Sequence, residues 1–193
     1  MGKDVLTLSD GPGSPIRVWI PGDPKGWPRP IPVLHRHRGK IRCSDKLGCR
    51  VKVVPGQADK AWRKVIASRV SLAVGRHRPW FQEGDCLVLA CRFNMKRPKS
   101  HFVACDRSRE LKASAPPADK YGLKPDYDNL AKTVADTLQA QRVGPGLLFS
   151  DDCCIDVGLQ RKLWADPKKG PGLDLIVCRV QDATGDVWAW LMH

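Results

Sequence analysis

Apolar and polar residues alternate along several stretches of the chain, and each alternation predicts a strand with one buried face. The clearest example is the apolar series Leu87, Leu89, Cys91, Phe93 and Met95. The predicted strands span residues 16–20, 87–95, 153–162 and 173–180.

Two other stretches repeat apolar residues at helical spacing. The first spans residues 58–74 and has Gly75 as its expected C-cap. Its apolar side carries Trp62, Val65, Ile66, Val70 and Ala73. The second helix spans about 128–141 and ends before the break Gly144-Pro145-Gly146.

The order strand, helix, strand, helix, strand, strand predicts an α+β fold, with a mixed or antiparallel sheet and two main helices packed on it. A chain of 193 residues suits a single domain. We expect a flexible N-terminus at 1–14, the folded domain at 15–182, and an apolar tail at 183–193 that docks on it.

The formal net charge is +13, which favours a polyanionic partner such as nucleic acid or an anionic membrane surface. Basic residues concentrate in two segments, 35–55 and 96–124. No run approaches the roughly 18 apolar residues that a membrane helix needs. The N-terminus lacks the apolar core of a signal peptide, so we expect a cytoplasmic, DNA-associated protein without a membrane partner.

Eight cysteines are scattered along the chain, and we expect reduced thiols rather than a secreted disulfide framework. Cys86, Cys91 and Cys178 are expected in the core. A group of zinc-competent side chains comprises His35, His37, Cys43 and Cys49. Their spacing is not that of a usual zinc site, so a basic loop is the favoured interpretation.

The second predicted helix carries an acidic row. Asp128, Lys132 and Asp136 recur every four residues on one face, and Asp126 precedes the helix. Two simpler explanations remain open: Asp126 or Asp128 caps the helix, and the row forms surface ion pairs.

A second acidic block, Asp151 and Asp152, comes just before a strand whose Ile155, Val157 and Leu159 are expected on one face. If the two blocks converge, several carboxylates share a small volume, which requires a cation. Hard oxygen ligands suit Mg²⁺, with Mn²⁺ as a substitute, and such an ion suits phosphodiester hydrolysis. No small-molecule cofactor is indicated.

The pattern D-x-D-N-L-x-K-x3-D-x-L, a later D-D pair and a lysine ten residues further on resemble the RusA family of Holliday junction resolvases. These residues are Asp126, Asp128, Asn129, Leu130, Lys132, Asp136, Leu138, Asp151, Asp152 and Lys162. An earlier block, Gly22-Asp-Pro-Lys25-Gly-Trp27-Pro-Arg29, is similar to the family's G-x-P-x-K-x-R-P-R, with Trp27 in place of an arginine.

The resemblance implies a nuclease domain, with Asp126, Asp128 and Asp152 as metal-binding catalytic acids and Lys132 as a catalytic lysine. Asp151 is a further candidate metal ligand, while Asp136 and Asn129 are expected to support the ligands. It also implies a homodimer that makes Mg²⁺-dependent paired incisions in four-way DNA junctions.

DNA contacts are expected from basic side chains, which neutralise phosphates without reading sequence. The candidates are Lys25, Arg29, Lys96, Arg97, Lys99, Lys124 and Lys162. On a regular strand Lys162 would lie roughly 33 Å from Asp152, so we expect it on the DNA surface instead of at its own chain's metal. Trp27, Trp80 or Phe102 could stack on an unpaired base, although core packing is the simpler role.

Two alternatives stay open. The chain could be a less selective nuclease for flaps and other branched DNA, or a non-catalytic basic DNA-binding protein whose aspartates only cap helices and balance charge.

Overall fold

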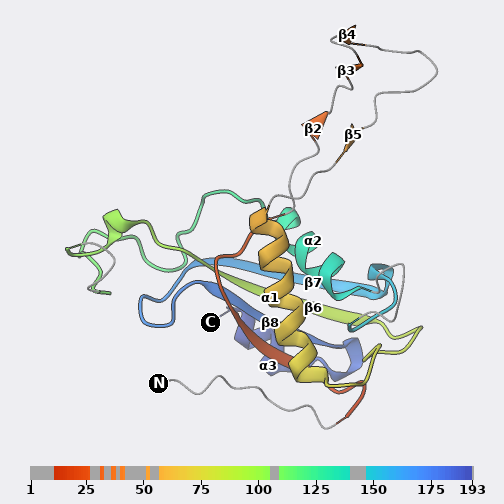
Figure 1. Cartoon of the computed structure of the whole chain (residues 1–193). Coiled ribbons are helices and arrows are strands. Elements are labelled where there is room, and N and C mark those ends of the chain that lie inside the picture. The colour runs from red at the N-terminus through yellow and green to blue at the C-terminus, as the bar shows by residue number, and fades with distance from the viewer. Residues whose placement is uncertain are drawn as a thin grey trace.

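The fold is seen in a computed structural model (Figure 1). It describes residues 11–26, 57–104, 109–139 and 147–192, together with four two-residue strands between 31 and 52. These are β2 (Ile31–Pro32), β3 (Arg36–His37), β4 (Lys40–Ile41) and β5 (Val51–Lys52). They pair as β2 with β5 and β3 with β4, both antiparallel, within the basic segment.

The main sheet has the strand order β1-β8-β6-β7. Its strands are β1 (Ile16–Pro21), β6 (Leu87–Met95), β7 (Ile155–Trp164) and β8 (Gly172–Arg179). β8 pairs antiparallel with β1 and β6, whereas β6 and β7 are parallel. The sheet is therefore mixed, and the predicted α+β class is confirmed.

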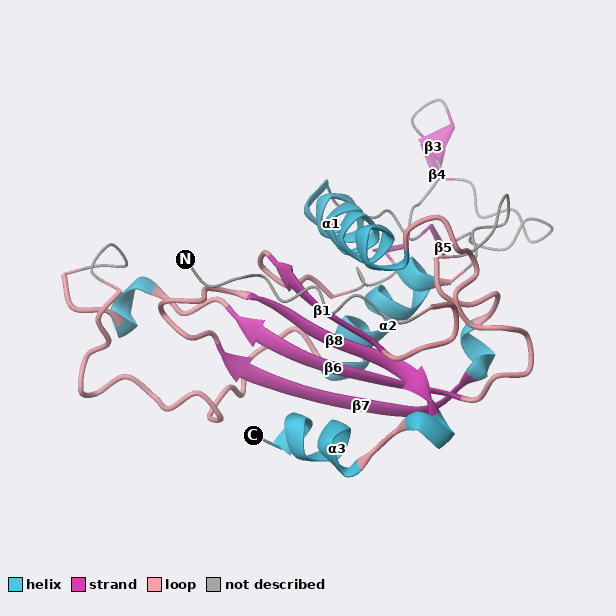
Figure 2. Ribbon diagram, turned by 90° about the horizontal axis from the view of Figure 1, so that it is seen from below, coloured by secondary structure: helices cyan, strands magenta, loops and turns pink. Residues whose placement is uncertain are grey.

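Helices α1 (Gln57–Val74) and α2 (Tyr127–Leu138) cover one face of this sheet (Figure 2). Their apolar sides meet the inward residues of the strands in one core cluster, to which Trp62, Ile66, Leu130 and Val134 contribute. Gly75 has a φ of +62° and ends α1 by donating to the Ser71 carbonyl, as a glycine C-cap should.

The apolar tail forms α3 (Gly185–Met192), which lies across the opposite face of the sheet (Figure 2). There Val187 and Trp190 pack against a smaller cluster of Val88, Ala90, Ile176 and Cys178. Short 3-10 turns complete the structure: η1 (Lys99–His101), η2 (Asp152–Cys154) and η3 (Val180–Asp182).

Two expectations about individual residues are wrong. Leu87 pairs with Ile155 but Val88 pairs with Val157, so β7 contains a bulge at its start. The bulge turns Ile155 towards the main cluster, while Val157 and Leu159 pack against the smaller one. Cys86 is exposed because it precedes β6, whereas Cys91 and Cys178 are buried as expected.

Candidate active site at the start of helix α2

Two carboxylates lie at the first turn of α2. Asp126 occupies the N-cap position, but its side chain makes no capping hydrogen bond to the helix. Asp128 is exposed in the first turn. The positive end of the helix dipole stabilises negative charge at both positions. The capping explanation therefore does not account for the Asp126 carboxylate.

The loop before these acids is held by Lys162, near the end of β7. Its Nζ donates hydrogen bonds to the carbonyl oxygens of Leu123 and Pro125, each at 2.9 Å. The same ammonium lies 5.2 Å from the ring centre of Tyr121 and 4.7 Å from that of Tyr127. Lys162 is only 9% exposed, so it is not the open phosphate contact that the sequence suggested.

The segment after β1 packs directly on the same helix end. A Cβ atom added to Gly26 would lie 3.0 Å from the Pro125 Cβ and 3.2 Å from the Asn129 Cβ. Only glycine allows so close an approach without displacement. The Gly22–Lys25 block and the acidic block, about one hundred residues apart in sequence, are therefore neighbours in the fold.

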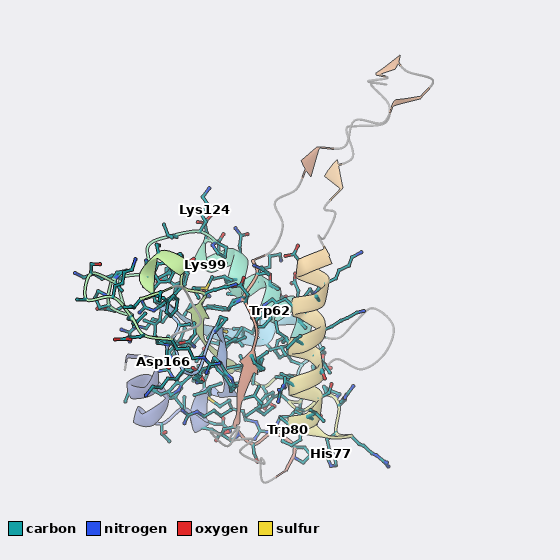
Figure 3. The ribbon with its side chains drawn as sticks, turned by 60° about the vertical axis from the view of Figure 1, so that its left-hand side comes forward. Trp62, His77, Trp80, Lys99, Lys124 and Asp166 are labelled. Atoms are coloured by element: carbon teal, nitrogen blue, oxygen red, sulfur yellow. The ribbon has the colours of Figure 1, made fainter. Side chains whose placement is uncertain are left out.

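A cleft of about 550 Å³ opens beside this contact. The carboxylates of Asp23 and Asp59 form part of its wall. The wall also includes five of the basic residues expected to contact DNA, namely Lys25, Lys96, Arg97, Lys99 and Lys124. Tyr121, Leu123 and Pro125 also line the cleft. Pro125 directly precedes Asp126 in the sequence, so the cleft ends next to this acid. Lys99 and Lys124 lie towards the same end of the molecule, away from Trp80 and His77 (Figure 3).

The basic side chains of the cleft are not equivalent. Arg97 is 7% exposed and donates to the carbonyl oxygens of Ala165 and Pro116, so it mainly ties loops together. Burial lowers the pKa of its guanidinium. Lys25 forms an ion pair with Asp23 at 2.6 Å. Lys96, Lys99 and Lys124 are exposed and remain the better candidates for phosphate contacts.

The second acidic block lies at the other end of α2 (Figure 1). The Leu148 N–H donates to the carbonyl oxygen of Leu138, the last residue of α2, and η2 follows a few residues later. Twelve helical residues span roughly 18 Å. Within one chain, Asp152 therefore lies far from Asp126 and Asp128, and the expected single-chain convergence of the two blocks is wrong.

Asp151 and Asp152 are both exposed. The Asp151 carboxylate accepts a hydrogen bond from the Cys153 N–H at 3.0 Å and so caps η2. This hydrogen bond, the largest of several effects, lowers the pKa of Asp151. Among the residues described, no three His, Cys, Asp or Glu side chains are grouped closely enough to hold a metal ion.

The donor chemistry of the α2 end suits a divalent cation only in part. Asp126 and Asp128 supply hard oxygen donors. Among the residues that the structure describes, no third carboxylate is grouped with them.

The remaining acidic row of α2 has structural contacts. Lys132 Nζ lies 3.6 Å from a carboxylate oxygen of Asp136, the pairing expected at this spacing. Arg63 of α1 donates to the Asp136 carbonyl and to the Thr137 hydroxyl, and so joins the two helices. Asn129 accepts a hydrogen bond from the Thr133 hydroxyl through its backbone carbonyl.

Several sequence expectations fall elsewhere. Trp80 and Phe102 are buried, at 3% and 8% exposure, so neither offers a free ring for stacking. Trp27, Arg29 and three of the zinc candidates, His35, Cys43 and Cys49, lie outside the described residues, and of His37 only its place in β3 is described. Across the part of the chain that is described, no helix has the length and apolar character needed to cross a bilayer.

A family model for endodeoxyribonuclease RusA matches residues 30–170. That match covers most of the chain, so this protein belongs to the RusA endodeoxyribonuclease family. It is accordingly a nuclease of the class that acts on Holliday junctions and other branched DNA, a class that generally uses a divalent metal. No curated protein and no solved structure matched the chain.

Proposed function

We propose that this protein resolves four-way DNA junctions by Mg²⁺-dependent paired incision, with Asp126 and Asp128 binding the metal. The observation that carries this is the position of the two carboxylates at a helix N-terminus beside a basic cleft. The cleft provides charge for the DNA backbone, and the acids provide oxygen donors next to it. A bound Mg²⁺ would polarise the phosphodiester and lower the pKa of water for attack.

Different residues of the chain then bind the DNA backbone, stabilise the reacting phosphate and position the carboxylates. Lys96, Lys99 and Lys124 hold the phosphate backbone along the cleft, and Lys25 extends this surface towards α2. Lys132, one turn beyond Asp128 and with its side chain 54% exposed, places its ammonium against the phosphate as negative charge develops. Lys162 and Gly26 keep the start of α2 in position, and so act on the acids without touching DNA.

We further propose that a second copy of the chain completes each metal site with Asp152. The placement of the two acidic blocks at opposite ends of α2 within one chain favours this assignment over a single-chain site. A two-fold dimer would place both blocks of each chain in two equivalent sites, one from each end. Two sites related by symmetry match the two equivalent strands of a four-way junction.

The deciding experiment incubates a synthetic four-way junction with the protein, with and without Mg²⁺, and maps the cuts. We expect symmetric cuts in two strands that require the metal. Asp128→Asn should abolish cutting but keep junction binding, because the basic cleft is unchanged; Asp119→Asn, an exposed loop acid, is the matched control. Cutting at the wild-type rate by Asp128→Asn would overturn the site assignment.

A parallel set of flap, splayed-arm and linear duplex substrates tests the substrate class. Equal cutting of all branched forms would replace the junction resolvase by a general branched-DNA nuclease. Absence of metal-dependent cutting on every substrate would leave only a DNA-binding role.

A further inference from the structure

Tyr127 is unusual among the aromatic residues of this protein. It is 47% exposed, whereas the other Trp, Phe and Tyr side chains whose exposure is described are buried or partly buried. Tyr121, which contacts the same Lys162 ammonium, packs edge to face on Trp164 at 4.6 Å between ring centres. The exposed part of this ring offers an apolar surface that no other side chain covers in the fold.

Tyr127 is flanked in the sequence by the two carboxylates proposed to bind the metal. Tyr127 lies between Asp126 and Asp128 at the start of α2. Leu123, four residues earlier, is 60% exposed and belongs to the wall of the basic cleft. The two side chains thus add exposed apolar surface beside the carboxylates and the basic cleft.

Lys162 supports both residues from within. Its ammonium lies 4.7 Å from the Tyr127 ring centre and donates to the Leu123 carbonyl oxygen at 2.9 Å. A cation near the ring at this distance is attracted by its π electrons and restrains its orientation. A ring that is restrained before binding loses little conformational freedom when a ligand stacks on it.

The charge around the ring selects the kind of ligand. Lys99 and Lys124 belong to the adjoining cleft and are exposed, so the surroundings attract a polyanion more than an apolar protein surface. Every nucleobase has a π face that stacks on an aromatic ring, and stacking tolerates any sequence. A base in a continuous duplex already has stacking partners, whereas a base at a branch point can leave its stack at lower cost.

We propose that Tyr127, together with Leu123, is a stacking platform for an unpaired nucleobase next to the cleaved phosphate. This inference rests on the proposed function and deepens it. Stacking of this base on the ring holds the neighbouring phosphate of branched DNA next to the Asp126 and Asp128 carboxylates. A linear duplex offers no unpaired base to the ring. Tyr127 is then a specificity-determining residue, because it favours the branch point over uninterrupted duplex.

The test uses a four-way junction with 2-aminopurine at the branch point, bound by the full-length protein in Ca²⁺, which is intended to allow binding without cleavage. Stacking on the wild-type ring should quench the fluorescence of this base. Tyr127→Ala should remove the quenching and weaken junction binding about tenfold, with little change in duplex binding. Tyr127→Phe should keep both properties, since stacking needs the ring and not the hydroxyl. Leu72→Ala removes another exposed apolar side chain, on α1, and should change neither.

Three results would overturn the platform. One is unchanged quenching in Tyr127→Ala, and another is an equal loss of affinity for junction and duplex. The third is a smaller oligomer for Tyr127→Ala than for the wild type in size-exclusion chromatography, which would make the ring a contact between copies of the chain. If the wild type cuts junctions but Tyr127→Ala behaves like it, only the platform fails. If the wild type neither binds nor cuts junctions, the proposed function fails with it.

Discussion

The Nζ atom of Lys162 lies 2.9 Å from the carbonyl oxygen of Pro125, the residue directly before Asp126. Through this hydrogen bond the end of β7 is joined to the start of α2 across 37 positions of sequence. The sheet, which holds the core, thereby fixes the loop that precedes the carboxylates. We therefore expect Lys162 to act on the carboxylates through the position of this loop, since its ammonium is buried between two tyrosine rings.

Replacing this lysine should separate catalysis from DNA binding. Lys162→Met keeps the aliphatic stem but removes both hydrogen bonds, so the loop at 123–125 should loosen and the carboxylates should lose their orientation. We expect cleavage to fall at least tenfold while junction affinity changes less than threefold. Loss of the two bonds should also lower the free energy of unfolding by about 1–3 kcal/mol.

The control for this variant is Lys64→Met, which removes an exposed charge from α1. Single-turnover cleavage, junction affinity and thermal unfolding should all remain close to wild type. A Lys162→Met protein that cuts normally while binding DNA poorly would contradict the positioning role. It would indicate instead that Lys162 contacts DNA directly.

The close approach of Gly26 to α2 gives a second way to disturb the acids. Gly26→Ala introduces a Cβ at 3.0 Å from the Pro125 Cβ and 3.2 Å from the Asn129 Cβ, so the helix end must shift by a few tenths of an ångström. We expect a severalfold loss of cleavage rate, since active-site geometry tolerates little displacement. Gly122→Ala, where nothing lies within 4 Å, is the matched control and should cut normally.

The exposed lysines of the cleft should govern the salt dependence of binding. Lys99→Gln and Lys124→Gln each remove one cation, so binding should weaken alike on junctions of different sequence. A plot of log affinity against log salt concentration should lose about one unit of slope per lysine. If either variant keeps the wild-type slope, that side chain does not contact phosphate.

Much of the fold could be predicted from periodicity. The expected helix at 58–74 is observed as Gln57–Val74, and the expected strand at 87–95 as Leu87–Met95. Each of these elements has one buried side, and a buried side requires apolar residues at regular spacing in the sequence. The bulge at the start of β7 cannot be recognised in this way. One extra residue reverses which side chains of the strand face the core, but it does not alter the composition of the segment.

The site was only partly predictable for a related reason. The acidic blocks are visible in the sequence, but the direction of α2 relative to β7 depends on tertiary packing. An antiparallel arrangement places Asp152 at the wrong end of the helix for Asp126. Tyr127 was missed although it lies inside the D-x-D motif, because its exposure is known only once its neighbours are placed.

Mixing two inactive variants tests whether Asp152 acts across the dimer. Asp128→Asn and Asp152→Asn should each be inactive alone, because every site lacks one carboxylate. In a mixed dimer, a shared site would combine the intact Asp128 of one chain with the intact Asp152 of the other, so one of the two sites recovers. We expect the mixture to nick junctions in single strands without paired incision, as read on denaturing gels after co-refolding. If each site used only its own chain, both sites of the mixed dimer would stay defective. No recovery, despite proof by differential tagging that mixed dimers form, would therefore refute the shared site.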